Sequence, residues 1–95
     1  MTVALLISAV RFSPSLVWRQ RDGLLGYVSC VLNGHVILDG IALRRTAGGR
    51  LALAFPKRRD RSGKRHALIR PLDSDARQEI ERQVFAALRD TGGLS

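Results

Sequence analysis

The stretch Arg50-Leu-Ala-Leu-Ala-Phe-Pro-Lys-Arg-Arg59 shows how the chain is organised. In its first half Leu51, Leu53 and Phe55 alternate with alanines, and this period of two is typical of a β-strand with one face in a core. Pro56 has no N–H group to donate to a neighbouring strand, so we expect it to end the strand. Three cations follow it directly. The sequence therefore predicts an apolar strand that leads straight into a strongly basic loop over residues 56–65.

Positive charge is concentrated around this loop. The 95-residue chain has 16 Lys and Arg against 8 Asp and Glu, and ten of the cations lie in residues 44–70, where Asp60 is the one acid. Such clustering favours a polyanionic partner, because each nucleic-acid phosphate that a cation neutralises releases a condensed counterion. A solvated loop that keeps the protein soluble is the alternative. The candidate nucleic-acid-binding residues are Lys57, Arg58, Arg59, Arg61, Lys64, Arg65, Arg44 and Arg45.

The segments around the loop predict an antiparallel sheet. Residues 24–32 and 35–45 are apolar runs joined by Asn33-Gly34, the pair most typical of a tight hairpin because both residues tolerate a positive φ. Within the second run the apolar positions change parity at Asp39-Gly40, which predicts a β-bulge. Further strands are expected at residues 2–12, 50–55 and 66–70, which makes about five strands in a meander.

A helix is expected over residues 74–90. Ala76, Ile80, Val84 and Leu88 recur at helical spacing and form an apolar stripe, and Asp73 or Ser74 can cap the helix. The opposite face carries Arg77, Arg82 and Arg89 among acids, so it is a weaker candidate for binding than the loop. The expected fold class is α+β, a curled antiparallel sheet with one C-terminal helix packed on it, in a single domain over residues 1–95.

Few residues in the chain favour catalysis or metal binding. The single cysteine, Cys30, lies in an apolar strand pattern and is expected to be buried, which fits a reducing, cytoplasmic location. His35 and His66 have no zinc-ligand spacing, and helix capping explains Asp73 and Asp75 better than a metal site does. We expect no enzyme activity, no metal or other cofactor, and no small-molecule substrate. No amphipathic segment with aromatic anchors favours a membrane partner.

The order of these features resembles the stage V sporulation protein G family (SpoVG, or putative septation proteins). The matching elements are the Asn33-Gly34 hairpin, Asp39-Gly40-Ile41, Phe55-Pro56-Lys57-Arg58, Arg61-Ser-Gly-Lys64, Ile69-Arg-Pro71 and Ser74-Asp-Ala-Arg77-Gln-Glu-Ile80. The resemblance runs to about Leu88, and residues 36–77 carry most of it. It implies a small α+β protein that forms a homodimer through its sheet and binds DNA and RNA as a bacterial regulator. The loop departs from the family by being more basic, at Arg59, Arg61, Lys64 and Arg65.

Two hypotheses about function follow. The first is a nucleic-acid-binding (DNA and/or RNA) bacterial regulator of the SpoVG type, acting in transcription, septation or sporulation through the basic loop. The alternative is a non-catalytic interaction module whose loop binds an acidic protein. A homodimer is expected in addition because a meander leaves open sheet edges. Residues 2–12, apolar on both faces, are the candidate strand to pair across a two-fold axis, and Trp18 is expected to contact the core or the second copy.

Overall fold

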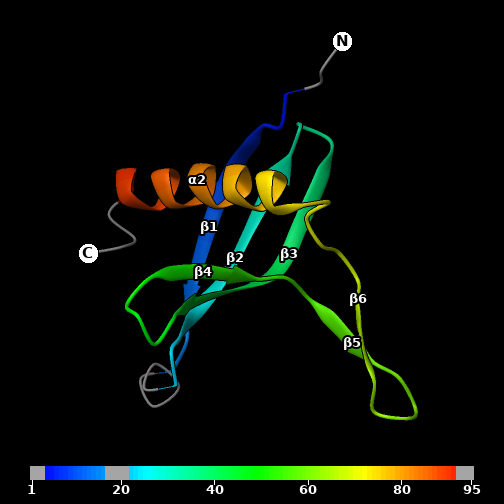
Figure 1. Cartoon of the computed structure of the whole chain (residues 1–95). Coiled ribbons are helices and arrows are strands. Elements are labelled where there is room, and N and C mark those ends of the chain that lie inside the picture. Colours follow the sequence, from blue (N-terminus) through cyan, green and yellow to red (C-terminus); the bar gives the residue numbers. More distant parts are fainter. Residues whose placement is uncertain (1–3, 17–21, 92–95) are drawn as a thin grey trace.

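Four antiparallel strands form the main sheet of the computed structural model, which describes residues 4–16 and 22–91 (Figure 1). The chain is therefore α+β, as predicted: one helix crosses one face of this sheet, and a separate two-stranded hairpin projects from the end of its last strand. The strand order in the main sheet is that of the sequence. The elements are β1 (Ile7–Pro14), β2 (Leu24–Leu32), β3 (Val36–Arg45), β4 (Leu51–Ala54), β5 (Lys57–Arg59), β6 (Arg65–Ala67) and α2 (Ser74–Asp90).

The β2–β3 hairpin confirms the prediction made from its turn and its change of parity. Asn33 and Gly34 both have positive φ, 53° and 72°, and the His35 N–H donates to the Leu32 carbonyl across the turn (3.0 Å). The register between the strands shifts where Val28 and Cys30 face Ile41 and Leu38. Gly40 lies in this bulge with a φ of 69°. The bulge is what allows both halves of β3 to direct large side chains into the same core.

The core lies between the sheet and α2. From the sheet come Val28, Cys30, Leu38, Ile41, Leu43 and Leu53, and from the helix come Ile80, Val84 and Leu88, all buried. The predicted helix boundaries are confirmed, and its N-cap is Asp73, whose Oδ1 accepts from the Ala76 N–H (2.8 Å). Cys30 is buried as predicted, and burial raises the pKa of its thiol.

The five-stranded meander is wrong in one respect, because residues 56–70 do not extend the main sheet. The segment predicted to be a loop contains β5, which pairs antiparallel with β6 in a sheet of its own. The fifth strand, predicted over residues 66–70, is thus a shorter strand over residues 65–67 with a different partner. Pro56 explains the break, since it separates β4 from β5 and cannot donate to a ladder.

The first strand begins later than predicted and is irregular. It starts at Ile7 and ends at Pro14, and its register with β2 shifts between Ser8 and Arg11. Ala9 lies in this bulge with a φ of 49°, which is uncommon for a residue with a Cβ. The predicted start of the strand, residues 2 and 3, and Trp18 lie outside the described residues. Among the described residues, no helix has both the length and the apolar character needed to cross a membrane.

Candidate nucleic-acid interface

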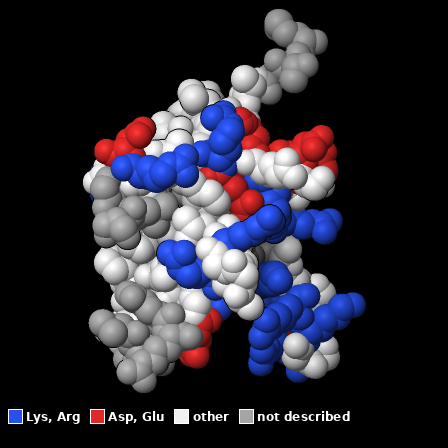
Figure 2. Space-filling view, turned by 60° about the vertical axis from the view of Figure 1, so that its left-hand side comes forward, with Lys and Arg blue, Asp and Glu red and all other residues white. Residues whose placement is uncertain are grey.

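Residues 57–67 form a short antiparallel ribbon, hereafter the basic hairpin, which consists of β5, β6 and the turn between them. Lys57 faces Ala67, Arg58 faces His66 and Arg59 faces Arg65. Every residue from 57 to 70 is exposed. Figure 2 shows Lys and Arg gathered at its lower right, where the hairpin projects from the body. Six of the eight predicted site residues are therefore brought together on one projecting element: Lys57, Arg58, Arg59, Arg61, Lys64 and Arg65.

Asp60 holds the turn of the hairpin. Its Oδ1 accepts from the N–H groups of Ser62 and Lys64, each at 2.9 Å, and from the Ser62 hydroxyl at 2.7 Å. The His66 Nε2 lies 2.7 Å from Oδ2 of the same carboxylate. The Ser62 hydroxyl and then His66 lower the pKa of Asp60 to about 2, because hydrogen bonds to the charged form favour it. The one acid of the segment thus organises the turn.

The cations of the hairpin have no acidic partners within the described part of the chain. The ion pairs found there are His66–Asp60, Arg77–Glu81 and Arg82–Glu79. Arg59 and Arg65 also lie directly opposite each other on the two strands, and like charges in that position destabilise a strand pair. A bound polyanion would remove this repulsion. The arrangement is therefore costly for the free protein and suits an anionic ligand.

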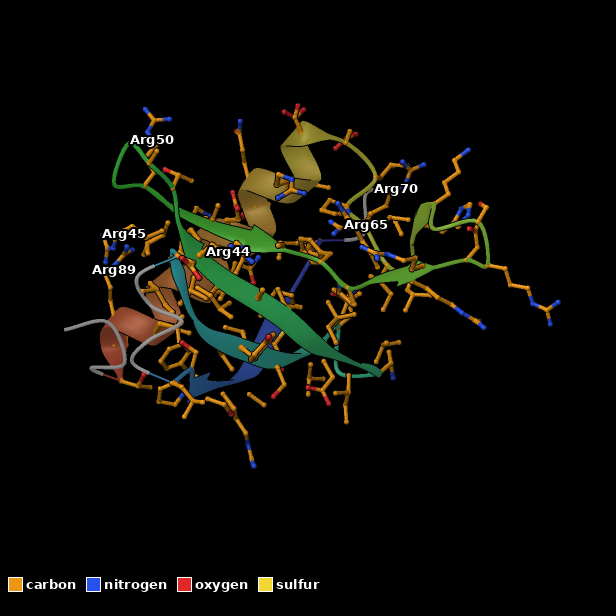
Figure 3. All side chains as sticks on the ribbon, turned by 90° about the horizontal axis from the view of Figure 1, so that it is seen from below. Arg44, Arg45, Arg50, Arg65, Arg70 and Arg89 are labelled. Carbon is orange, nitrogen blue, oxygen red and sulfur yellow. The ribbon has the colours of Figure 1, made fainter. Side chains whose placement is uncertain are left out.

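Arg44 and Arg45, the other two predicted site residues, lie apart from the hairpin. They end β3 and pair with Ala52 and Leu51, at the start of β4, whereas the hairpin follows the end of β4. Figure 3 shows them with Arg50 and Arg89 on one side of the molecule, and Arg65 and Arg70 on the other. The Arg45 Nη1 donates to the Gly49 carbonyl within the β3–β4 turn (3.3 Å). The predicted set therefore divides into six residues at one end of β4 and two at the other.

Two arginines outside the predicted set, Arg70 and Arg77, lie beside the hairpin. They help to line a pocket of about 480 Å³ where β4, the base of the hairpin and the start of α2 meet. Arg77 donates from Nη1 to the Leu53 carbonyl (2.8 Å), and its guanidinium carbon lies 5.5 Å from the centroid of the Phe55 ring. The expectation that Arg77 lies on the face opposite the apolar stripe is therefore wrong. A signal was available in the sequence, because Arg77 precedes the stripe residue Ile80 by three positions, which places it beside the buried face of the helix.

The remaining cations of the helix are less suited to binding an anion. The Arg82 Nε donates to Glu79 Oε1 at 2.8 Å, and this hydrogen bond lowers the pKa of Glu79. The charge of Arg82 is therefore balanced by its neighbour. Arg89 lies in the last turn of α2, where a cation interacts favourably with the helix dipole. Among residues 4–16 and 22–91, no group of three or more His, Cys, Asp or Glu is placed to hold a metal ion.

No model of a known protein family matches the chain, and no curated protein matches it either. The resemblance to the stage V sporulation protein G family thus rests on the ordered motifs described above.

Proposed function

We propose that the protein binds nucleic acid, DNA or RNA, through the basic hairpin, and that it acts as a bacterial regulator of the kind its motifs resemble. The observation that carries this proposal is the hairpin itself. Six exposed cations lie on one projecting ribbon, its single acid is engaged in the turn, and Arg59 lies directly opposite Arg65. Nucleic acid supplies closely spaced negative charge that such a surface can neutralise.

The choice of cation supports a phosphate-rich partner. Four of the six hairpin cations are arginines, and the planar guanidinium can donate two parallel hydrogen bonds to phosphate oxygens or to the edge of a guanine. The hairpin is also short, and the Leu68 N–H donates to the Pro56 carbonyl (3.1 Å), which closes the ribbon at its base. Lys57 and Arg65 also line the pocket at the base of the hairpin, so a ligand bound to them would meet that surface as well.

A salt titration of binding tests this proposal. Fluorescence anisotropy would follow the binding of labelled single-stranded and duplex oligonucleotides of mixed sequence at several salt concentrations. If all six cations contact phosphates, the slope of log K against log salt for a single strand should be about −4. The triple variant Lys57→Ala/Arg58→Ala/Arg59→Ala should bind more weakly, and its slope should be shallower by about 2.

A charge-matched control separates the hairpin from net charge. The variant Arg50→Ala/Arg82→Ala/Arg89→Ala removes three cations from the β3–β4 turn and the helix, and it should keep most of the affinity and the slope. Affinity that is insensitive to salt would contradict the proposal, and so would equal losses in the two triple variants. Binding of an acidic protein without any nucleic-acid binding would instead favour the interaction-module hypothesis.

We also propose that the protein forms a homodimer through its sheet. Helix α2 covers one face of the sheet, while Tyr27 and Ile37 are 43% and 69% exposed. Tyr27 alternates with buried neighbours in β2, and Ile37 lies opposite Val31, so both side chains are on the face away from the core. A second copy that covers this face would bury its apolar side chains.

A further inference from the structure

We propose that the pocket at the base of the basic hairpin binds one unpaired nucleotide, so that the protein holds single-stranded nucleic acid at this point. The inference rests on the proposed function and specifies which form of nucleic acid the surface takes. The base of the nucleotide would lie against the apolar side of the pocket, and its phosphate would be held by the arginines and the lysine at the rim.

The pocket has an apolar side and a cationic side. Leu53 and Phe55, both buried, and Ile69, which is 41% exposed, give it apolar walls. Lys57, Arg65 and Arg70 give it positive charge, and Arg77, which is paired with Glu81 (3.8 Å), adds a guanidinium group. No Asp or Glu is among the described residues that line the pocket. Figure 3 shows Arg65 and Arg70 close together between the hairpin and the start of the helix. A ligand that uses the whole pocket must combine an apolar body with an anionic group.

A nucleotide has this combination, whereas a phosphate alone does not. A free phosphate would use the cations and leave the apolar walls uncovered. An unstacked base has two apolar faces and can stack on a guanidinium plane or lie against an apolar side chain. The pocket volume of about 480 Å³ lies within the range of about 300–1,000 Å³ usual for small-molecule sites. A base within a duplex cannot make such contacts, because its neighbours in the stack cover both of its faces.

One cation of the pocket, Arg77, is held in place before any ligand binds. The Arg77 guanidinium donates to the Leu53 carbonyl (2.8 Å) and lies 3.8 Å from Glu81 Oε2. Lys57 and Arg65 lie on the hairpin and also line the pocket, so they connect the two surfaces. A strand whose phosphates follow the hairpin can therefore place one base in the pocket without leaving the basic surface.

A cycle of one protein variant and one ligand variant tests the inference. The protein variant is Ile69→Ala, which removes apolar wall and changes no charge, and Leu72→Ala is its control because Leu72 is 92% exposed and does not line the pocket. The ligand variant is a single strand with abasic sites, which keeps its phosphates. Wild-type protein should bind the normal strand about five- to tenfold more tightly than the abasic strand. Ile69→Ala should lose this preference while the salt slope is unchanged, and Leu72→Ala should keep it.

The outcomes separate this inference from the proposed function. Equal, salt-dependent binding of normal, abasic and duplex ligands by wild-type protein would overturn the pocket and leave the hairpin as the binding surface. Tighter binding of duplex than of single strand would overturn it in the same way. No binding of any nucleic acid would contradict the proposed function, and the inference with it. Thermal unfolding of the Ile69→Ala variant checks that the effect is not a loss of fold.

Discussion

Asp60, the one acid of the basic hairpin, holds the turn of the hairpin in place. Four donors converge on its carboxylate, two from backbone N–H groups and two from the side chains of Ser62 and His66. The turn that results holds Arg61 and Lys64 at the tip of the hairpin. A positively charged residue at position 60 would add another cation but would leave these donors without an acceptor.

The hairpin should therefore respond to acid at an unusually low pH. The pKa of Asp60 is about 2 in the folded protein, against an ordinary value of 3.8. A depressed pKa means that its contribution to the turn is complete above about pH 3.8 and is lost as the pH falls toward about 2. NMR should show the amide resonances of Ser62 and Lys64 titrating together with a midpoint near pH 2, and the Asp60→Asn variant should lack this transition. A midpoint near 3.8 would contradict the arrangement.

Ala9 is the one described non-glycine residue besides Asn33 with positive φ. Its Cβ makes the left-handed conformation costly, whereas glycine adopts it freely. We expect Ala9→Gly to raise the free energy of unfolding by about 0.5–1 kcal/mol. The control Ala52→Gly, in the regular strand β4, should lower it by a similar amount. Urea denaturation measures both, and a loss of stability in both variants would show that the bulge does not need this conformation.

Helix α2 fastens both edges of the sheet through polar side chains. Gln83 accepts from the Ile7 N–H (2.7 Å) and donates to the Leu5 carbonyl (2.8 Å), at the start of β1. On β4, Leu53 donates its N–H to Glu81 (3.0 Å) and accepts from Arg77 (2.8 Å). These contacts satisfy backbone groups that an edge strand would otherwise offer to another chain. The helix thus covers the core and also blocks parts of the two edges.

Removing the contact to β1 should weaken the fold measurably. Gln83→Ala leaves the Ile7 N–H and the Leu5 carbonyl without their partner, and we expect the free energy of unfolding to fall by about 1–3 kcal/mol. Gln78→Ala is the matched control, since Gln78 is exposed on the same helix, and it should change stability by less than about 0.5 kcal/mol. Equal effects in the two variants would mean that the Gln83 side-chain amide does not help to hold the helix against β1.

As a whole, the molecule has two layers and one uncovered face. If a second copy covers that face, light scattering at micromolar concentration should give twice the mass of one chain. Ile37→Glu would place like charges in the interface and should give the monomer mass, because Ile37 is 69% exposed and its change costs the monomer little. Leu72→Glu, a substitution at another exposed position, should leave the dimer intact. A wild-type monomer at that concentration would contradict the proposed homodimer.

Charge also differs from one part of the molecule to another. The hairpin carries six cations that have no acidic partner among the described residues, whereas the helix holds acids that pair with Arg77 and Arg82. Figure 2 shows red side chains among the blue in its upper part and a dense blue group at its lower right. A polyanion would therefore be attracted to the hairpin end first, and salt would screen this attraction.

Strong local patterns made the main sheet and the helix predictable. The boundaries of β2 and of α2 match the prediction, because alternation, the Asn33-Gly34 turn and the Asp73 cap are properties of neighbouring residues. Strand β5 was missed since Lys57, Arg58 and Arg59 show no apolar alternation. It forms because Asp60 reverses the chain and brings β6 alongside, which is a contact that periodicity does not report.

The binding surface, too, follows partly from local sequence and partly from tertiary contacts. The six hairpin cations could be named from the sequence because they lie within nine residues of one another, so no fold could separate them far. Arg44 and Arg45 precede Lys57 by 13 and 12 residues, and an extended β4 rises about 3.3 Å per residue and carries the hairpin away from them. Arg70 and Arg77, in contrast, come to lie beside Lys57 and Arg65, because the chain turns back after β6. Clustered charge is a local property of a chain, whereas a pocket needs segments that meet, and only packing of α2 against the sheet makes these segments meet.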